Sequence, residues 1–419
     1  MRNRTLLVAG LGGLAMLGGV RPGHAQVVPG DIDKTNIRPS AHALGLGGSY
    51  LLLGDDSYGV IFNPAAAAQA RQAAGLGLAA EGQTSNINIG DVTKLVDRLK
   101  TLRDQINNNP NNPNNLQGAQ GAFNDVYNFA TAAGASGASP ARLTGSVSAG
   151  IGGSGGGLLS VIHLHGLSFG AVAYGGVSAD ARITAQTLGD GSRNITINGG
   201  AVGLTSIGIP VAYLLPNNAG TVGLTPKIVR ADYAGFNDNA TENATQTGGS
   251  ITGAAFGEVN SQQFDLDAGY ISPTLTVSPA PGAPPVAVQG ALVVRHILSP
   301  SFSLAKNINN ASAGFQDTAP ANFNFSLHPE VDLGAGASAY GARLVGEVHN
   351  IGGENGGGHT FHVGAEYTAF KYVVPRIGYD NDRFVYGLGL NFGPLRFNAA
   401  AGTDPQQRAA ADLSLNFGL

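Results

Sequence analysis

Two pairs of histidines are the residues whose spacing could support metal binding. His163 and His165 stand two apart in a segment of alternating polarity, so both side chains would lie on one face of a strand. His359 and His362 stand three apart, so in a strand they would lie on opposite faces. Zinc sites usually take three or four protein ligands, and the sequence offers no recognisable third ligand beside either pair. We therefore expect polar filling of an interior, with no metal and no cofactor.

A glycine-rich stretch is the pattern that could bind phosphate. Gly45-Leu46-Gly47-Gly48-Ser49 lacks the lysine of a phosphate-binding loop and does not lie in a βαβ unit. Nucleophilic catalysis needs a serine or cysteine beside a base that a third group orients. The chain has no cysteine, and its sequence shows no such serine and histidine set. These patterns predict a protein that is not an enzyme.

The composition narrows the class of protein. The 419 residues include 64 glycines and no tryptophan or cysteine, 12% are charged, and the net charge is −4. Soluble domains usually have about twice that charged fraction, and nucleic-acid-binding domains usually carry a basic surface. Beyond the N-terminal region, no stretch of about 18 residues reads as an apolar helix. Two classes of protein remain, a closed membrane β-barrel and a secreted glycine-rich β-adhesin. We expect no contact with nucleic acid.

The N-terminus has the layout of a secretory signal peptide. Arg2 and Arg4 precede an apolar run over residues 6–20, and Gly23-His24-Ala25 supplies small residues at a cleavage site. We expect cleavage after Ala25, so that residues 1–25 are removed from an exported protein. An uncleaved anchor is the alternative, but the apolar run is short for a spanning helix.

From residue 140 to residue 419 the hydrophobic pattern has a period of two, which is typical of strands. In 221–228 and 382–392, large apolar residues alternate with glycine, polar and charged residues. This alternation fits lipid outside and a lumen inside, although a soluble sandwich alternates too. At roughly 20 to 23 residues for each strand and connection, we predict an all-β membrane protein: an antiparallel transmembrane β-barrel of about 12–14 strands.

The connections and the last strand extend this prediction. Short turns indicate two hairpins, 371–380 with 382–392 and 395–403 with 410–419, whereas 236–250 and 279–285 should be long loops. Alternating apolar residues run to Leu419, although such barrels usually end in an aromatic residue. We expect the barrel assembly machinery to bind this C-terminal strand and outer-membrane lipid to surround the barrel.

A helical insertion is predicted over residues 86–138. Apolar residues recur every three or four positions from Val92 to Ile106, a loop rich in Asn and Pro follows, and a second helix would bury Phe123, Val126, Tyr127 and Ala130 on one side. The insertion either contacts a membrane or a partner protein, or packs on its own barrel.

Residues 26–75 contain the most specific motif of the chain. Its parts are Gly45, Gly47 and Gly48 in the glycine-rich turn, the acidic pair Asp55 and Asp56, and the box Asn63-Pro64-Ala65. This spacing resembles the start of the FadL-type outer-membrane transporter superfamily, and within it the TraF-like proteins of plasmid transfer operons. The match covers about 30 residues. The resemblance implies that residues 26–75 form a hatch inside the barrel, where the two aspartates would meet arginines.

The resemblance leaves two functions open. One is service in conjugal transfer or envelope assembly, with envelope or transfer-system proteins as partners. The other is passive transport of small hydrophobic molecules across the outer membrane, for which a disturbed strand at Pro210 or Pro226 could form a lateral exit. The residues assigned to the lumen are mainly Gly, Ser, Asn, Thr and His, and the amphipathic insertion could form a contact surface for a partner, so we expect the assembly role.

Overall fold

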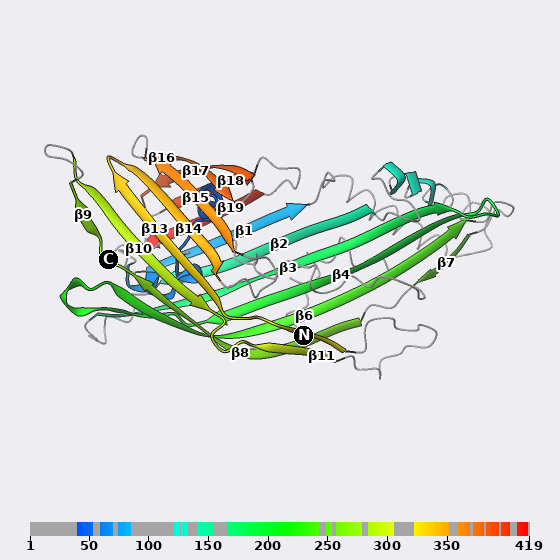
Figure 1. The fold of residues 1–419 in the computed structure, drawn as a ribbon, viewed down its shortest axis with the longest axis horizontal. Coiled ribbons are helices and arrows are strands. Elements are labelled where there is room, and N and C mark those ends of the chain that lie inside the picture. Colours follow the sequence, from blue (N-terminus) through cyan, green and yellow to red (C-terminus); the bar gives the residue numbers. More distant parts are fainter. Residues whose placement is uncertain are drawn as a thin grey trace.

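The dominant feature of the structure is a closed ring of antiparallel strands (Figure 1). The computed structural model describes residues 40–52, 59–69, 74–84, most of 121–132, 141–154, 166–242, 249–253, 257–278, 284–305, 322–351, 359–368, 372–380, 383–393, 395–402 and 409–417. Within these residues, 17 strands form one sheet, in which β5 (Val211–Leu214), β7 (Gly249–Gly253) and β9 (Leu275–Val277) are short strands beside longer ones.

The other fourteen strands of the described sheet make the ring. In ring order they are β1 (Ala74–Thr84), β2 (Ala141–Ser154), β3 (Leu167–Thr187), β4 (Arg193–Gly208), β6 (Thr221–Glu242), β8 (Gly257–Ile271), β10 (Val286–Arg295), β13 (Glu330–Ala339), β14 (Ala342–Ile351), β15 (Thr360–Tyr367), β16 (Val373–Asp380), β17 (Arg383–Phe392), β18 (Leu395–Gly402) and β19 (Ala409–Phe417). Each strand pairs with the next, and β19 pairs with β1. The antiparallel barrel and its strand number agree with the sequence-based prediction.

The strands place apolar side chains outside and small or polar ones inside. In β17, Phe384, Tyr386 and Phe392 are each more than half exposed, whereas Val385 is buried and Gly387 lies against the interior. The segment 221–228 of β6 has the same alternation, with its apolar residues exposed and Lys227 buried. The two faces are those expected from the sequence pattern.

Two features of the barrel differ from the prediction. The ring begins at β1, which precedes the helical insertion, so this insertion connects two neighbouring strands of the barrel. β1 was not predicted as a strand because it is rich in Gly and Ala and shows no clear alternation of apolar and polar residues. The predicted loop over 236–250 is also wrong in part, because β6 continues to Glu242 and β7 begins at Gly249. Backbone pairing between these two strands outweighs the low strand propensity of Asn and Asp.

The barrel is longer on one side than on the other (Figure 1). β3 and β6 have 21 and 22 residues, whereas β15, β16 and β18 have 8 each, so the first strands project beyond the rest. Both predicted C-terminal hairpins, β16 with β17 and β18 with β19, are confirmed. The side chains of β19 lie outside the described residues. The hairpin of β11 (Ser301–Ala305) and β12 (Asn322–Ser326) forms a separate sheet, and the short helix η3 (Pro216–Asn218) follows β5.

The described part of the helical insertion lies at the projecting end. Helical residues occur between 121 and 132, and Phe123 and Ala130 are buried, as the second predicted helix requires. The Arg193 guanidinium lies over the rings of Phe123 and Tyr127, and the Tyr127 hydroxyl hydrogen-bonds to Thr187 at 3.2 Å. These contacts show that this helix packs on the β3–β4 hairpin of its own barrel. The helix predicted from Val92 to Ile106 lies outside the described residues.

Among the described residues, no helix is long and apolar enough to span a membrane.

Candidate functional site: the inner segment and its wall

Residues 40–52 and 59–69, here called the inner segment, occupy the interior of the ring. The segment contains α2 (Ala41–Gly45), α3 (Gly59–Phe62) and the 3-10 helix η2 (Pro64–Ala68). α2 contacts strands β16 to β19, whereas η2 contacts β3, β5, β6 and β8 across the ring. Most of its side chains are buried, although the segment is too short to form a core of its own. The barrel wall therefore supplies most of its packing.

The glycine-rich turn lies directly on the strands of the wall. Gly47 and Gly48 have φ of 71° and 86°, a left-handed conformation that side chains disfavour. A Cβ atom at Gly364 in β15 or Gly378 in β16 would overlap backbone atoms of Leu46 or Gly47. Glycines on both surfaces are thus required for this close approach.

The Asn63-Pro64-Ala65 box packs on the wall at the other end of the segment. Asn63 Oδ1 accepts a hydrogen bond from the Ala65 N–H at 3.0 Å, and its Nδ2 donates to the Leu51 carbonyl at 3.1 Å. The box contacts the wall at two glycines, because a Cβ at Gly223 would overlap Pro64 and Ala65, and a Cβ at Gly269 would overlap Asn63. Asn63 therefore joins two stretches of the segment while the wall accommodates them.

A wall carboxylate binds the backbone in the middle of the segment. The two Glu347 oxygens accept from the N–H groups of Tyr50 and Leu51 at 2.9 and 2.8 Å. His349 Nε2 lies 2.7 Å from the same carboxylate, and the Arg343 guanidinium donates to the Leu52 carbonyl. Hydrogen bonds to charged groups are stronger than neutral ones, so these contacts fix Tyr50 to Leu52 on β14.

Arg295 at the end of β10 forms a second anchor. It is fully buried and donates to the Phe62 carbonyl at 3.1 Å. Its guanidinium pairs with Glu330 at 3.0 Å and with Asp332, and it lies 5.0 Å from the Tyr50 ring centroid. One cation therefore balances two wall carboxylates and binds the inner segment at once.

A third anchor holds α2. His42 Nε2 lies 3.0 Å from Glu366 Oε2, which also accepts from Arg376 Nε at 2.9 Å. His362 Nδ1 lies 2.7 Å from the Gly47 carbonyl and 3.0 Å from Asp380. His359 lies just before β15 and is exposed, whereas His362 within β15 is buried, so the two histidines do not share a site.

The apolar side chains of the inner segment pack on apolar side chains of the wall. Leu51, Val60, Ile61 and Phe62 belong to one buried cluster with side chains of the neighbouring strands. The wall residues in this cluster are Val172, Tyr174, Ala212, Ile271, Ala291, Val293 and Val345. Two strands carry both kinds of contact, because Val293 and Arg295 lie on β10 and Val345 and Glu347 lie on β14. The apolar wall residues pack on the side chains of the segment, whereas the charged ones bind its backbone.

The sequence identified part of this site. Gly45, whose added Cβ would lie 3.2 Å from Gly387 Cα, joins the turn glycines and the Asn-Pro-Ala box at the wall. Asp55, Asp56, His163 and His165 lie outside the described residues. Sequence reasoning missed the lumenal charges and expected mainly Gly, Ser, Asn, Thr and His there. The signal was present as ionisable residues at even spacing, such as Arg343, Glu347 and His349 in β14.

The two prolines singled out as an exit do not open the sheet. The partners of β4 and β5 in β6 follow one continuous register on both sides of Pro210. The Ile209 N–H donates to the Pro226 carbonyl at 3.1 Å, and the Gly170 N–H donates to the Pro210 carbonyl at 2.8 Å. Each proline therefore removes one donor from the ladder without separating the strands.

No family model matches the chain, and no curated protein matches it. Among solved structures, the toluene transporter TbuX of Ralstonia pickettii is 10% identical to this chain, with a TM-score of 0.38. The match covers 91% of this chain and 99% of the TbuX chain. The translocator domain of autotransporter NalP from Neisseria meningitidis is 11% identical, with a TM-score of 0.35. The match covers 92% of this chain and 100% of the NalP domain. The CymD monoaromatic hydrocarbon channel is 12% identical, with a TM-score of 0.32, and the match covers 92% of this chain and 99% of the CymD chain. Likenesses this low carry no argument about function, which must come from the site itself.

Proposed function

We propose that this chain is an outer-membrane barrel for the passive passage of small apolar molecules, with the inner segment as its movable plug. The observation that carries the proposal is the way the lumen is filled. The segment lies across the ring with its apolar side chains on apolar wall residues, and its backbone is tied to charged wall residues through hydrogen bonds. Strand pairing closes the ring without any of these residues, so the segment can move while the barrel stays closed.

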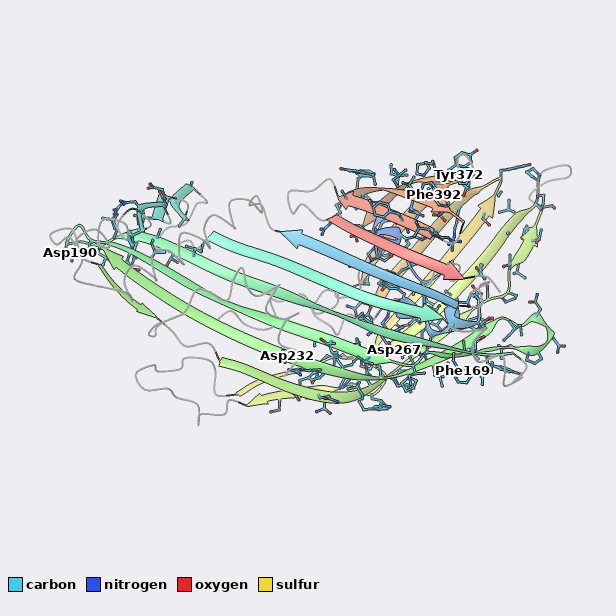
Figure 2. All side chains as sticks on the ribbon, turned by 180° about the vertical axis from the view of Figure 1, so that it is seen from behind. Phe169, Asp190, Asp232, Asp267, Tyr372 and Phe392 are labelled. Atoms are coloured by element: carbon cyan, nitrogen blue, oxygen red, sulfur yellow. The ribbon has the colours of Figure 1, made fainter. Side chains whose placement is uncertain are left out.

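The surface of the barrel supports the membrane location. Large apolar side chains more than 40% exposed occur on β6, β8 and β13 to β17, and they point away from the lumen. Tyr340, Tyr367 and Tyr372 are exposed near the turns at the short-strand end, where Figure 2 shows Tyr372 beside Phe392. An apolar band with aromatic residues near its border is typical of an outer-membrane barrel.

The wall beneath the plug supports the class of cargo. Displacement of the inner segment would expose apolar wall residues, among them Val172, Ile271 and Val293, to the lumen. Apolar ligands require such a surface, with a few polar groups to orient them. The proposal assigns no enzymatic step to the protein.

The helical insertion gives less support to a role in conjugal transfer or envelope assembly. That role was expected because an amphipathic insertion could contact a partner. The apolar residue Phe123 is instead buried, and Tyr127 hydrogen-bonds to the barrel. The TraF-like resemblance therefore stays a prediction.

Uptake of an uncharged aromatic dye into bacterial cells tests the proposal. Cells that make this protein should take up 1-N-phenylnaphthylamine faster than cells with an empty vector, because the outer leaflet alone resists apolar solutes. The rate of fluorescence increase measures passage, and a large cationic dye controls for general leakiness. Equal naphthylamine uptake with and without the protein would contradict the proposal.

A further inference from the structure

Four ionisable groups converge on the lumenal wall beside the inner segment. Lys227 of β6 lies 2.7 Å from Asp267 of β8 and 3.2 Å from Asp265, two residues earlier in that strand. His296, the residue after β10, lies 2.7 Å from Asp265 through Nδ1. Figure 2 shows Asp267 on the wall, far from Asp190 at the projecting end. The group brings together three segments that are distant in the sequence.

The group is buried and carries an excess of negative charge. Lys227, Asp265, Asp267 and His296 are between 0% and 8% exposed. The two carboxylates face one ammonium, and buried charges are costly unless they are compensated. In addition, Asp265 Oδ1 is buried without a hydrogen-bond partner. A buried carboxylate oxygen with no donor points to a further cation among these groups.

The ligand types and spacing fit a transition metal. One ligand atom each from Asp265, Asp267 and His296 lies within 4.8 Å of the other two. Ligands bound to one zinc-class ion at about 2.0–2.2 Å lie at most about 4.4 Å apart, so small side-chain rotations would complete a site. Two carboxylates with an imidazole favour zinc or cobalt over calcium or magnesium, which prefer oxygen ligands alone.

The backbone also positions His296. Its φ of 53° is left-handed, and its N–H donates to Asp267 Oδ1 at 3.0 Å. The Ile297 N–H donates to the Leu266 carbonyl at 3.0 Å, which fixes the chain after β10 on β8. The imidazole therefore reaches Asp265 from a defined backbone conformation.

We propose that Asp265, Asp267 and His296 form a binding site for a divalent transition-metal ion, and that the Lys227 ammonium is its built-in competitor. A bound ion would join β8 to the end of β10 next to Arg295, which anchors the plug. No metal site was expected from the sequence, because the histidine pairs that are close in sequence lack a third ligand and these three segments are far apart in the chain. The proposed site does not depend on passage through the barrel.

Cobalt titration of the detergent-solubilised full chain, without a histidine tag and after EDTA treatment, tests this site. The wild type should show a saturable visible absorption band, and Lys227→Met should bind Co²⁺ more tightly by roughly tenfold, because the competing charge is gone. The paired variant Asp265→Asn with Asp267→Asn should lose the band. His349→Gln, which changes another buried histidine beside a carboxylate, should keep it.

Other outcomes overturn the proposal. If neither the wild type nor Lys227→Met gives a saturable band, the group binds no metal ion and the site is excluded. If the band persists in the paired asparagine variant, the metal binds elsewhere. If Lys227→Met fails to fold, the comparison of the wild type with His296→Gln decides, because His296→Gln should weaken binding and equal affinity would exclude the site.

Discussion

Deletion of residues 40–69 should convert a closed barrel into an open pore. The ring of strand pairs does not include these residues, so the barrel should still close. The deletion removes the side chains and helices that fill the lumen, so single-channel conductance in planar bilayers should rise several-fold over that of the full chain. The charged residues in the ion-pair networks beside the inner segment also predict the selectivity. Seven of them are acidic and four are basic: Asp265, Asp267, Glu330, Asp332, Glu347, Glu366 and Asp380 against Lys227, Arg295, Arg343 and Arg376. The open pore should therefore prefer cations.

Deletion of residues 121–132 is the matched control for this experiment. These residues pack on the outer end of the β3–β4 hairpin, so their removal should leave conductance unchanged. Each deletion variant should migrate at a different rate on a gel before and after boiling, which would verify that it still forms a barrel. Unchanged conductance in a folded protein lacking residues 40–69 would show that the inner segment blocks nothing.

Arg295→Ala should cause the largest loss of stability from a single substitution. The change leaves Glu330 and Asp332 buried without their cation and removes the donor to the Phe62 carbonyl. Breaking a buried ion pair on one side costs about 3–5 kcal/mol. The free energy of unfolding in urea, followed by gel migration of unboiled samples, measures the loss.

A charge-matched variant separates this cause from simple loss of packing. Arg295→Met combined with Glu330→Gln and Asp332→Asn removes the uncompensated charges and should recover part of the lost stability. If Arg295→Ala unfolds at the same urea concentration as the wild type, Arg295 does not anchor the wall.

The barrel could be predicted from the sequence because its signal is local. Alternation in β17 assigns Phe384 to the outside and Val385 to the inside from neighbouring residues alone. β1 was missed because Gly and Ala give little contrast between the two faces. The loop predicted over 236–250 shows the reverse error, since pairing between β6 and β7 is a long-range property.

The candidate site could be predicted only on the side of the inner segment. The glycine-rich turn and Asn63 stand out because their spacing is compact in sequence. Their partners do not, because Glu347 is 297 residues from Tyr50 and Arg295 is 233 residues from Phe62. The alternation within one strand shows which side chains face inward, but it does not show which part of the inner segment they will contact. The cluster of Lys227, Asp265, Asp267 and His296 was also missed, because His296 is 31 residues from Asp265 and Lys227 is 40 residues from Asp267.

Locking the inner segment to the wall tests the central claim most directly. A Cβ built on Gly336 in β13 lies 2.9 Å from Cδ1 of Leu52, the far end of a flexible side chain that Leu52→Cys removes, so cysteines at these two positions would have their sulfur atoms within reach of a disulfide. The chain has no cysteine of its own to compete. Naphthylamine uptake by cells with the oxidised Leu52→Cys, Gly336→Cys protein should fall to the empty-vector rate and return on reduction, whereas each single variant should be insensitive to reduction. Uptake that continues at the wild-type rate through the oxidised, disulfide-linked protein would show that passage does not require movement of this segment.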